Sequence, residues 1–536
     1  MEEKLGARPY RPGHLGWLVP LLITALAGVL RLRNLDVPHL LIFDETYYAK
    51  DAYALLTAGH ELVWPEGADD RWLSGSADPT EEGSYVVHPP LGKWLIAIGI
   101  QLFGIESGFG WRVSAAVAGT LGVLLITLIA QRMFRSVFLG AVAGVLTAVD
   151  GHHLVMSRVA MLDIFLMLFV LAAFGALLMD RYSTRRRLAA WAEQSGQVQQ
   201  RQVQQGQKRQ HQGQPPPKGP RMLWRPWLFA AGILLGAATA VKLSALAFIA
   251  AFGIMVVLWD LQARRAAGVP RWAFSGLTRD LPWALVTVLP LALTAYVASW
   301  AGWLLTSTGS YRQWHTHNDA EGLAALIPGP LRSLWAYHAD AAGFHQGLTD
   351  GHDYASSPWT WLFMGRPVSM HYQSYEHGEA PPWDPEAVCG ADACSSAILD
   401  LANPLIWWTG LIGLIVVLLL WAGRRDWRAG AILAGYAGGF AVWLLFPDRT
   451  MFFFYTISIH PFVILTLVVL AALVLRAGTA GAAGPRLREM RRRNTVIVLC
   501  FLLMAVAVSV FFHPLWTGEL IPTEQWRLRM WIRSWI

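Results

Sequence analysis

Two adjacent carboxylates, Asp44 and Glu45, stand at the end of an apolar run in the stretch HLLIFDETYYAKDAYALL, residues 39–56. Other ionisable side chains also lie beside apolar segments, where they raise the free energy unless they are solvated, paired or used in a reaction. They come from four further parts of the chain and comprise His88, Lys93, Arg112, Asp150, His152, His153, Arg158, Asp163 and Lys242. Carboxylates combined with cations suit transfer of a group from a phosphate ester. Cations stabilise the charge on the leaving phosphate, and a carboxylate accepts the proton of an acceptor hydroxyl.

Asp44 and Glu45 are expected to have different roles because they are neighbours. Adjacent positions on a helix do not share a face, so the two carboxyl groups should not converge like those of a retaining glycosidase, which lie roughly 5 Å apart. One base opposite the leaving group implies a single displacement with inversion. Glu45 would then orient the site or pair with a neighbouring cation. Spacing alone favours a simpler alternative, in which both acids only complement the dipole at the start of a helix.

The other candidates also have ordinary structural interpretations. Arg158 and Asp163 are close enough in sequence to form an ion pair across a tight external turn, and Lys242 is placed where an outer turn between two spans is expected. The histidines between residues 315 and 377 fit solvated or acceptor-groove positions, because no tight ligand spacing such as H-E-x-x-H occurs. The sequence therefore predicts no metal ligands and no certain cofactor. A divalent metal is compatible with the site but not implied by it.

The elements that position these residues are expected to be membrane helices. Of the 536 residues, 54% are hydrophobic and 15% are charged, against roughly 25% charged in soluble domains. Runs of about 20 apolar residues, the length that crosses the hydrocarbon core, recur along the chain. The predicted fold class is an all-α polytopic membrane protein with about eleven spans. These lie near residues 15–30, 112–132, 137–151, 160–180, 227–241, 243–260, 281–305, 403–422, 430–446, 452–475 and 495–513.

The net charge of +7 reflects membrane topology rather than nucleic-acid binding. Basic residues form short clusters between apolar runs, such as RRR at 185–187 and at 491–493, which is typical of cytoplasmic loops. With a cytoplasmic N-terminus, most of the Lys and Arg lie in inner loops. Loop 31–111, loop 306–402 and the C-terminal tail then face outward from the cell membrane, which places Asp44 and Glu45 outside.

The chain divides into three predicted parts. Residues 1–265 form an N-terminal membrane module, residues 266–402 a connecting span and large external loop, and residues 403–536 a four-span module with an external tail. Segment 89–104 is apolar but short, so it is expected to lie along the membrane interface. The glutamine-rich segment 194–220 is expected to be a disordered cytoplasmic linker without an assigned function. Cys389 and Cys394 have a spacing that allows either a disulfide or metal binding with histidines.

Five motifs, taken together, carry a family resemblance. FDETYYAKDAYAL, HPPLGKWLI, WRVSAAVAGTL, SRVAMLDIFLMLF and AVKLSALAF, in this order, resemble the actinobacterial protein O-mannosyltransferases. These are relatives of the dolichyl-phosphate-mannose protein mannosyltransferases of fungi and animals. The region from YHADAAGFHQG through NPLIWW to the closing spans is similar to that family's C-terminal four-span module. The resemblance implies a C-type glycosyltransferase fold with its active site at the outer membrane face. It also implies a polyprenyl-phosphate mannose donor and, as acceptors, Ser and Thr of exported polypeptides.

The resemblance also implies roles for individual residues. Asp44 is the expected catalytic base, Glu45 its companion, and Arg112 an arginine near the donor. His88, Lys93 and Lys242 match motif positions that serve the donor phosphate or the loop architecture, and Arg158 and Asp163 lie in the fourth motif as further candidates for donor binding. Loop 306–402 is too short for the β-trefoil module of eukaryotic members.

Two alternatives stay open. A transferase of the same fold would move a sugar to a glycolipid or cell-wall glycan. A lipid or sugar transporter would use the same apolar helices, but transporters carry their ionisable residues near the bilayer midplane and show internal repeats.

Overall fold

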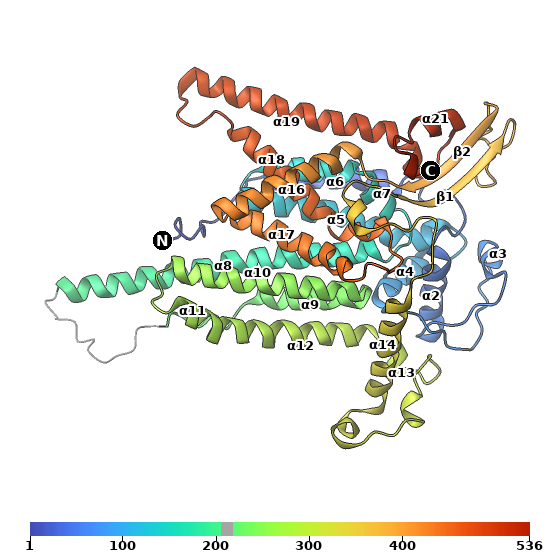
Figure 1. The fold of residues 1–536 in the computed structure, drawn as a ribbon, viewed down its shortest axis with the longest axis horizontal. Coiled ribbons are helices and arrows are strands. Elements are labelled where there is room, and N and C mark those ends of the chain that lie inside the picture. The colour runs from blue at the N-terminus through green and yellow to red at the C-terminus, as the bar shows by residue number, and fades with distance from the viewer. Residues whose placement is uncertain (205–217) are drawn as a thin grey trace.

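The computed structural model describes residues 1–204 and 218–536, with side chains described for residues 1–195 and 218–536. Long helices lie side by side along one axis, and the two ends of the chain lie at opposite ends of the bundle (Figure 1). Within the described residues, eight helical segments are long and apolar enough to cross a membrane. They are Leu15–Leu32 (α1), Gly108–Phe134 (α5), Asp163–Ser195 in α8, Leu243–Ala266 around α10, Trp272–Ser299 around α12, Pro404–Arg424 (α16), Trp427–Leu445 around α17, and Gly484–Phe512 (α19).

Each of the eleven predicted spans falls on a helix, but three of those helices are short. They are α6 (Val137–Val149), α9 (Pro226–Val241) and α18 (His460–Arg476). A fourth short apolar helix, α4 (Leu91–Phe103), matches the predicted interfacial segment 89–104. The multi-pass helical architecture is therefore confirmed, whereas the number of eleven spans stays a prediction.

The predicted span 452–475 is divided in two. A 3-10 turn, η6 (Phe453–Ser458), precedes α18, whose second residue is Pro461. Proline is favoured in the first turn of a helix because its missing N–H has no intrahelical partner there. The helix therefore starts at His460, and the residues before it form a separate buried turn.

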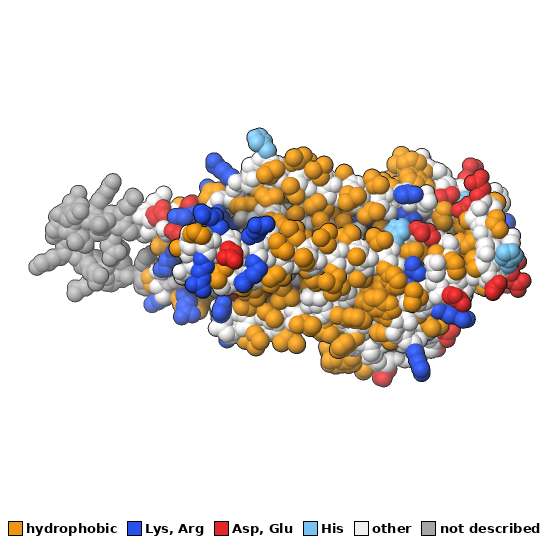
Figure 2. All heavy atoms as spheres, turned by 90° about the horizontal axis from the view of Figure 1, so that it is seen from above, with side chains coloured by type: hydrophobic (Ala, Val, Ile, Leu, Met, Phe, Trp, Pro, Cys, Tyr) orange, Lys and Arg blue, Asp and Glu red, His pale blue; other side chains and the backbone are white. Residues whose placement is uncertain are grey.

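Side-chain types are segregated along the bundle. Figure 2 shows a broad hydrophobic band between one end where Lys and Arg gather and an opposite end where Asp and Glu gather. This pattern fits a protein whose middle is surrounded by lipid. The helix α8 (Asp163–Gln204) extends beyond the basic end, so the first part of the predicted linker 194–220 is helical, and residues 205–217 of that linker lie outside the described part of the chain.

The N-terminal and C-terminal parts share one core. Phe174 of α8 lies between Phe252 of α10 (Leu246–Ala266) and Phe462 of α18, with ring centroids 5.8 Å and 5.3 Å away. All three rings are fully buried. The N-terminal and C-terminal parts, which the sequence divides at residues 265 and 402, therefore pack against each other in one hydrophobic core.

The loop segments build the acidic end of the bundle. They contain α2 (Glu45–Ala58), α3 (Ala68–Leu73), α7 (Gly151–Met156), α13 (Ala301–Leu305), α14 (Gly329–Gly347), α15 (Pro358–Trp361), α20 (Pro514–Thr517) and α21 (Thr523–Leu528). The remaining helices are α11 (Trp272–Ser275), α12 (Leu281–Ser299) and α17 (Trp427–Phe440), which belong to spans given above.

A small antiparallel sheet completes the outer loops. Strands β1 (Val368–Glu376), β2 (Ala393–Asp400) and β3 (Leu520–Pro522) pair in the order β1-β2-β3, with Tyr375 opposite Cys394. This sheet is an addition to the predicted all-helical architecture, and it joins the large loop to the C-terminal tail. Cys389 and Cys394 form a disulfide beside the β1–β2 turn, which settles the choice between the two predicted uses of these cysteines.

Candidate active site

Asp44 lies at the turn that leads into α2, and its carboxylate does not cap that helix. Phe43 adopts a left-handed φ of 49°, which is uncommon for a bulky residue and persists only where the surrounding structure imposes it. Asp44 occupies the N-cap position, as its spacing indicated, but its side chain accepts no capping hydrogen bond. The ion pairs around it join other residues, so the half-buried Asp44 carboxylate is available for chemistry.

The Glu45 carboxylate lies in a different environment, where hydrogen bonds use both of its oxygen atoms. Its Oε1 and Oε2 atoms accept hydrogen bonds from Nε and Nη2 of Arg112, both at 2.8 Å. The backbone N–H of Ala160 and that of Ile42 also donate to Glu45, at 2.8 Å and 3.1 Å. Because the side chain is wholly buried and its acceptor sites are filled, Glu45 has no free oxygen for a substrate proton.

Hydrogen bonds also use every N–H group of the Arg112 guanidinium. Besides its two bonds to Glu45, it donates to three backbone carbonyls of the segment that precedes α2, those of Leu35, Pro38 and Leu40, at 2.8–3.2 Å. A guanidinium has five N–H groups, and all five are used. Arg112 therefore fixes the shape of the 35–45 turn, and no N–H is left for a donor phosphate.

Asp163 and Lys242 form an ion pair, and the charges of both residues act on the Asp44 carboxylate. Asp163 starts α8, Lys242 follows α9, and the Lys242 Nζ donates to both carboxylate oxygens at 2.9 Å. Phe454 connects this pair to the turn at Asp44, since its ring lies 5.8 Å from that of Phe43 and 5.5 Å from Nζ. An ammonium has three N–H groups, so one remains free for a further acceptor.

A cavity of about 280 Å³ opens beside Lys242. Its polar and aromatic lining residues are His88, Lys242, Ser244, His345, Gln346, Trp443, Phe446, Arg449 and Tyr455. The rings of His88 and His345 stack at 5.5 Å, and His88 also lies 6.3 Å from Tyr48, one turn along α2 from Asp44. The cavity thus brings together first-loop, central and C-terminal segments around two cations.

The environment changes the protonation of the groups around this cavity. Burial raises the pKa of Asp44 to about 6, and the Asp163 charge adds to this, whereas Lys242 and the Tyr48 hydroxyl act in the opposite direction. Burial lowers the pKa of His88 well below its usual value, and Lys242 lowers it further. Burial and the Arg449 charge lower the pKa of His345 to about 4. At neutral pH, Asp44 is therefore ionised but close to its titration range, and both imidazoles are neutral.

Lys93 lies in a separate buried cluster. It is 1% exposed, forms an ion pair with Glu61, and lies 3.7 Å from Asp51. Burial raises the pKa of Asp51 to about 7, although Lys93 acts against this rise. These contacts hold α4 to α2 and to the segment that follows it. Of the two possibilities implied for Lys93, loop architecture and donor phosphate, the geometry favours the first.

Arg158 does not pair with Asp163, and that interpretation of the sequence is wrong. Arg158 donates to the backbone carbonyls of Leu30, Arg31, Arg33 and Asn34 at 2.7–3.4 Å, around the end of α1. The last carbonyls of a helix have no intrahelical partner and attract cationic donors. Arg158 therefore caps α1, and Asp163 is left for Lys242.

The remaining sequence candidates, Asp150, His152 and His153, contact residues in the C-terminal part of the chain. His152 Nδ1 lies 2.6 Å from Oδ1 of Asp400 in β2, and Asp150 lies 3.3 Å from Nε2 of His460. The rings of His153 and His460 are 5.1 Å apart. All of these side chains are wholly buried, which identifies them as interior packing residues.

Arg449 and Tyr455 were not anticipated from the sequence. Arg449 donates to the backbone carbonyl of His345 at 3.2 Å, and its guanidinium lies 5.8 Å from the Tyr455 ring, which in turn lies 4.5 Å from the Lys242 Nζ. A signal was present in FPDRTMFFFYT, which places a cation on a short turn between two apolar runs, next to an aromatic cluster. Among the described residues, no group of His, Cys, Asp and Glu is arranged to hold a metal ion.

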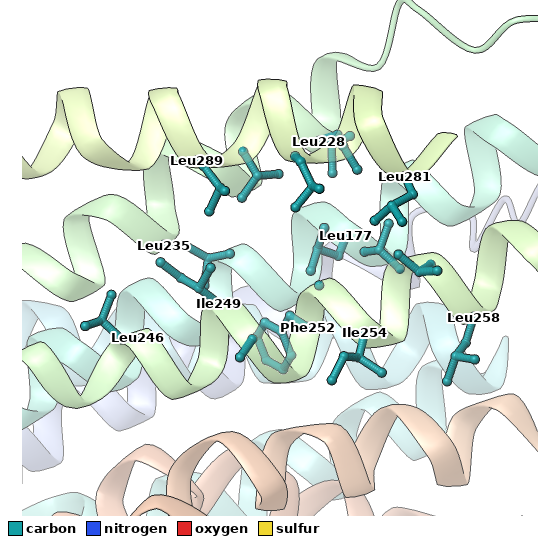
Figure 3. A pocket seen from close by; sticks show the side chains of 17 residues that line it. Leu177, Leu228, Leu235, Leu246, Ile249, Phe252, Ile254, Leu258, Leu281 and Leu289 are labelled. Atoms are coloured by element: carbon teal, nitrogen blue, oxygen red, sulfur yellow. The ribbon is translucent and has the colours of Figure 1, made fainter. Parts of the chain in front are cut away.

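A second cavity, of about 570 Å³ and lined by apolar side chains, lies between α8, α9, α10 and α12. Figure 3 shows side chains of neighbouring helices pointing into it, among them Leu235, Ile249 and Leu289. Leu246, at the start of α10, lines both cavities. The Lys242 cavity, which two cations line, and the apolar cavity thus share one lining residue.

Comparisons with known proteins agree across the chain. The family model described as the C-terminal four TMM region of protein-O-mannosyltransferase matches residues 330–535, and that described as dolichyl-phosphate-mannose-protein mannosyltransferase matches residues 87–193. Proteins named polyprenol-phosphate-mannose–protein mannosyltransferase are similar over nearly the full length. The relative from Mycolicibacterium smegmatis is 36% identical over 97% of this chain and 93% of its own, and that from Corynebacterium glutamicum is 31% identical over 92% and 88%.

A solved structure is similar in fold. The structure of the S. cerevisiae protein O-mannosyltransferase Pmt1-Pmt2 complex bound to the sugar donor matches with a TM-score of 0.67 and 14% identity. The match covers 97% of this chain and 92% of that chain. At this sequence identity the similarity concerns the fold alone, and it confirms the predicted C-type glycosyltransferase fold.

Proposed function

The chain belongs to the family of the polyprenol-phosphate-mannose protein mannosyltransferases and is a membrane glycosyltransferase. From this premise we propose that it transfers mannose from a polyprenyl-phosphate mannose donor to Ser or Thr hydroxyls of exported proteins at the outer membrane face. One observation carries the proposal: of the two adjacent acids, Glu45 forms a buried ion pair with Arg112, whereas Asp44 forms no ion pair with any described residue and the charges of Lys242 and Asp163 act on its pKa.

The proposed reaction is a single displacement at C1 of mannose. The acceptor hydroxyl oxygen attacks C1 as its proton passes to the Asp44 carboxylate. The bond between C1 and the phosphate oxygen breaks, and its electron pair leaves with the polyprenyl phosphate. Because attack and departure occur on opposite faces, the configuration at C1 inverts. Asp44 is suited to this role because a base whose pKa of about 6 lies just below neutral pH is ionised and still a useful proton acceptor.

Lys242 and Arg449 are the proposed partners of the donor phosphate. The Lys242 Nζ has one N–H beyond its two bonds to Asp163, and Arg449 lines the same cavity. Preorganised cations stabilise the charge that grows on a leaving phosphate, and no strong acid is then required. Arg112, which was expected near the donor, is reassigned as a positioning residue because its five N–H groups are already used.

The apolar cavity provides a place for the polyprenyl chain. It shares the lining residue Leu246 with the Lys242 cavity, and its lining is made of aliphatic and aromatic side chains from α8, α9, α10 and α12 (Figure 3). A lipid phosphate needs a cationic site for its headgroup joined to an apolar site for its tail. The shared residue Leu246 supports this arrangement for a donor bound from the outer leaflet.

The acceptor class distinguishes this proposal from its nearest alternative. Purified enzyme would be given polyprenyl-phosphate mannose together with either a Ser/Thr-rich peptide or a glycolipid. We expect mannosylated peptide whose anomeric configuration, read by NMR, is opposite to that of the donor. Mannosylation of the glycolipid alone would contradict the protein acceptor. Retained configuration would contradict the single displacement, and donor translocation without transfer would favour a transporter.

A further inference from the structure

A third cavity, of about 310 Å³, lies at the basic end of the bundle. Its charged lining consists of four arginines, Arg8, Arg135, Arg181 and Arg428, and one glutamate, Glu3. Arg181 lies on α8, which begins at Asp163, so a rise of 1.5 Å per residue separates these two residues by roughly 27 Å along the helix. The cavity is therefore distinct from the active site.

Arg181 is buried in this cavity without a polar partner. The side chain is 5% exposed, and it makes no hydrogen bond or ion pair with any residue that the structure describes; its buried Nε is among the unpaired donors. Its guanidinium carbon lies 3.6 Å from the ring centroid of Trp427, so the planar group stacks on the indole. A buried guanidinium without hydrogen bonds is costly, and such groups are normally paired with an anion.

The neighbouring groups add positive charge and do not satisfy Arg181. Arg135 donates to the carbonyls of Arg8 and Pro9 at 2.9 Å and 3.2 Å, and Arg428 donates to the carbonyl of Met133 at 2.9 Å. The acids nearby are already paired. Glu3 accepts from Arg8 at 2.9 Å, and Asp426 lies 3.6 Å from Arg428. The cavity keeps an excess of cations around the free guanidinium.

We propose that this cavity binds the phosphate group of an anionic phospholipid, with Arg181 as its principal donor. Arginine matches phosphate oxygens with two parallel N–H groups, and stacking on Trp427 holds that fork in place. The source is a lipid because the lining combines arginines with Tyr182 and Trp427, the residue types that meet headgroups, and belongs to the basic end of the bundle, which borders the hydrophobic band (Figure 2). The lining spans the N-terminal tail, the end of α5, α8 and α17, so the bound phosphate would join the N-terminal and C-terminal parts of the chain.

The test compares three probes on the full-length protein in a neutral detergent: phosphatidylglycerol, phosphatidylcholine and inorganic phosphate. Native mass spectrometry gives the lipid retained, and the unfolding midpoint gives its stabilising effect. We expect phosphatidylglycerol to be retained and to raise the midpoint, and the other two probes to do neither. Arg181→Gln should weaken phosphatidylglycerol binding about tenfold, as expected for losing a hydrogen bond to a charged group.

Two further variants make the result decisive. Arg186→Gln changes an exposed arginine on the same helix outside the cavity, and it should bind phosphatidylglycerol as the wild type does. Arg428→Gln should weaken binding in the same direction as Arg181→Gln, which covers the case in which Arg181→Gln does not fold. The proposal is overturned if both cavity variants bind like the control or if phosphatidylcholine binds equally well. Equal stabilisation by inorganic phosphate would overturn the lipid as the source.

Discussion

Asp44 and Glu45 are neighbours in sequence with opposite environments, and this difference defines the site. Glu45 is held by Arg112 and by two backbone N–H groups, whereas Asp44 has no capping bond and lies near Lys242 and Asp163. Adjacency alone indicated that the roles would differ, and the family motif indicated which acid is the base. The sequence could not reveal the reason, because two partners of Glu45, Arg112 and Ala160, lie far away along the chain.

The raised pKa of Asp44 predicts an acidic limb in the pH profile. A base works only when it is ionised, and burial places this transition at about 6 in the free enzyme. As pH falls through 6, kcat/KM should therefore decrease, approaching about tenfold per pH unit. Initial rates of peptide mannosylation between pH 5 and 8 would measure this, with the unfolding midpoint followed in parallel. A flat profile down to pH 5 would argue against Asp44 as the base.

Replacing Glu45 predicts a loss of stability. Glu45→Gln leaves the Arg112 guanidinium buried without a counter-charge, and breaking a buried ion pair in this way costs about 3–5 kcal/mol. The unfolding midpoint in detergent should fall clearly below that of the wild type. Glu81→Gln, at an exposed position of the same loop, serves as the matched control and should leave the midpoint unchanged. Equal midpoints for the two variants would contradict the structural role given to Glu45.

At the scale of elements, apolar patterning predicted the helices well and the long-range pairings poorly. Each predicted span coincides with a helix, since length and hydropathy are local properties. Closeness in sequence suggests an ion pair between Arg158 and Asp163. In the structure, Arg158 instead donates to carbonyls at the end of α1, and Asp163 pairs with the distant Lys242. The strand β3 could not be predicted because it has only three residues and forms against a strand more than a hundred residues away.

The turn η6 links the buried interior to the active site, and this connection predicts an indirect effect on donor binding. His152 lies between Asp400 in β2 and Thr456 in η6, at 2.6 Å and 3.2 Å, and Tyr455 is the adjacent residue that contacts Lys242. Asp400→Asn should weaken the His152 contact and lower the free energy of unfolding by about 1–3 kcal/mol. Loosening η6 should also raise KM for the donor.

Steady-state kinetics and unfolding of Asp400→Asn would measure both effects. Asp384→Asn, at an exposed position of the loop between β1 and β2, is the control and should behave as the wild type. An unchanged KM in a destabilised Asp400→Asn enzyme would confine the residue to a purely structural role.

At the scale of the whole molecule, charge is sorted along the membrane axis. The basic end carries the arginine cavity, and the acidic end carries the loops, the sheet and Asp44 (Figures 1 and 2). The positive-inside rule predicts that the basic end lies in the cytoplasm, and this orientation would place the proposed active site on the side where exported chains emerge. Composition and the distribution of Lys and Arg therefore predict the orientation, although the fold alone is compatible with either direction.

Cysteine labelling would test this orientation. In a Cys500→Ser background, Asp384→Cys should react with a membrane-impermeant maleimide in intact cells, because residue 384 is exposed at the acidic end. Arg491→Cys, exposed at the basic end, should react only after the cells are permeabilised. The reverse labelling pattern would invert the topology and place Asp44 in the cytoplasm.

Peptide mannosylation by Asp44→Asn, measured beside the wild type, tests directly whether Asp44 is the base. The control is Asp70→Asn, a change at an exposed acid of the same loop. Asp44→Asn should fold with a midpoint at or above that of the wild type, because it removes a carboxylate charge whose pKa burial raises to about 6, and it should lose about two orders of magnitude or more in transfer rate, while Asp70→Asn stays fully active. Near-normal transfer by a folded Asp44→Asn enzyme would contradict this role for Asp44.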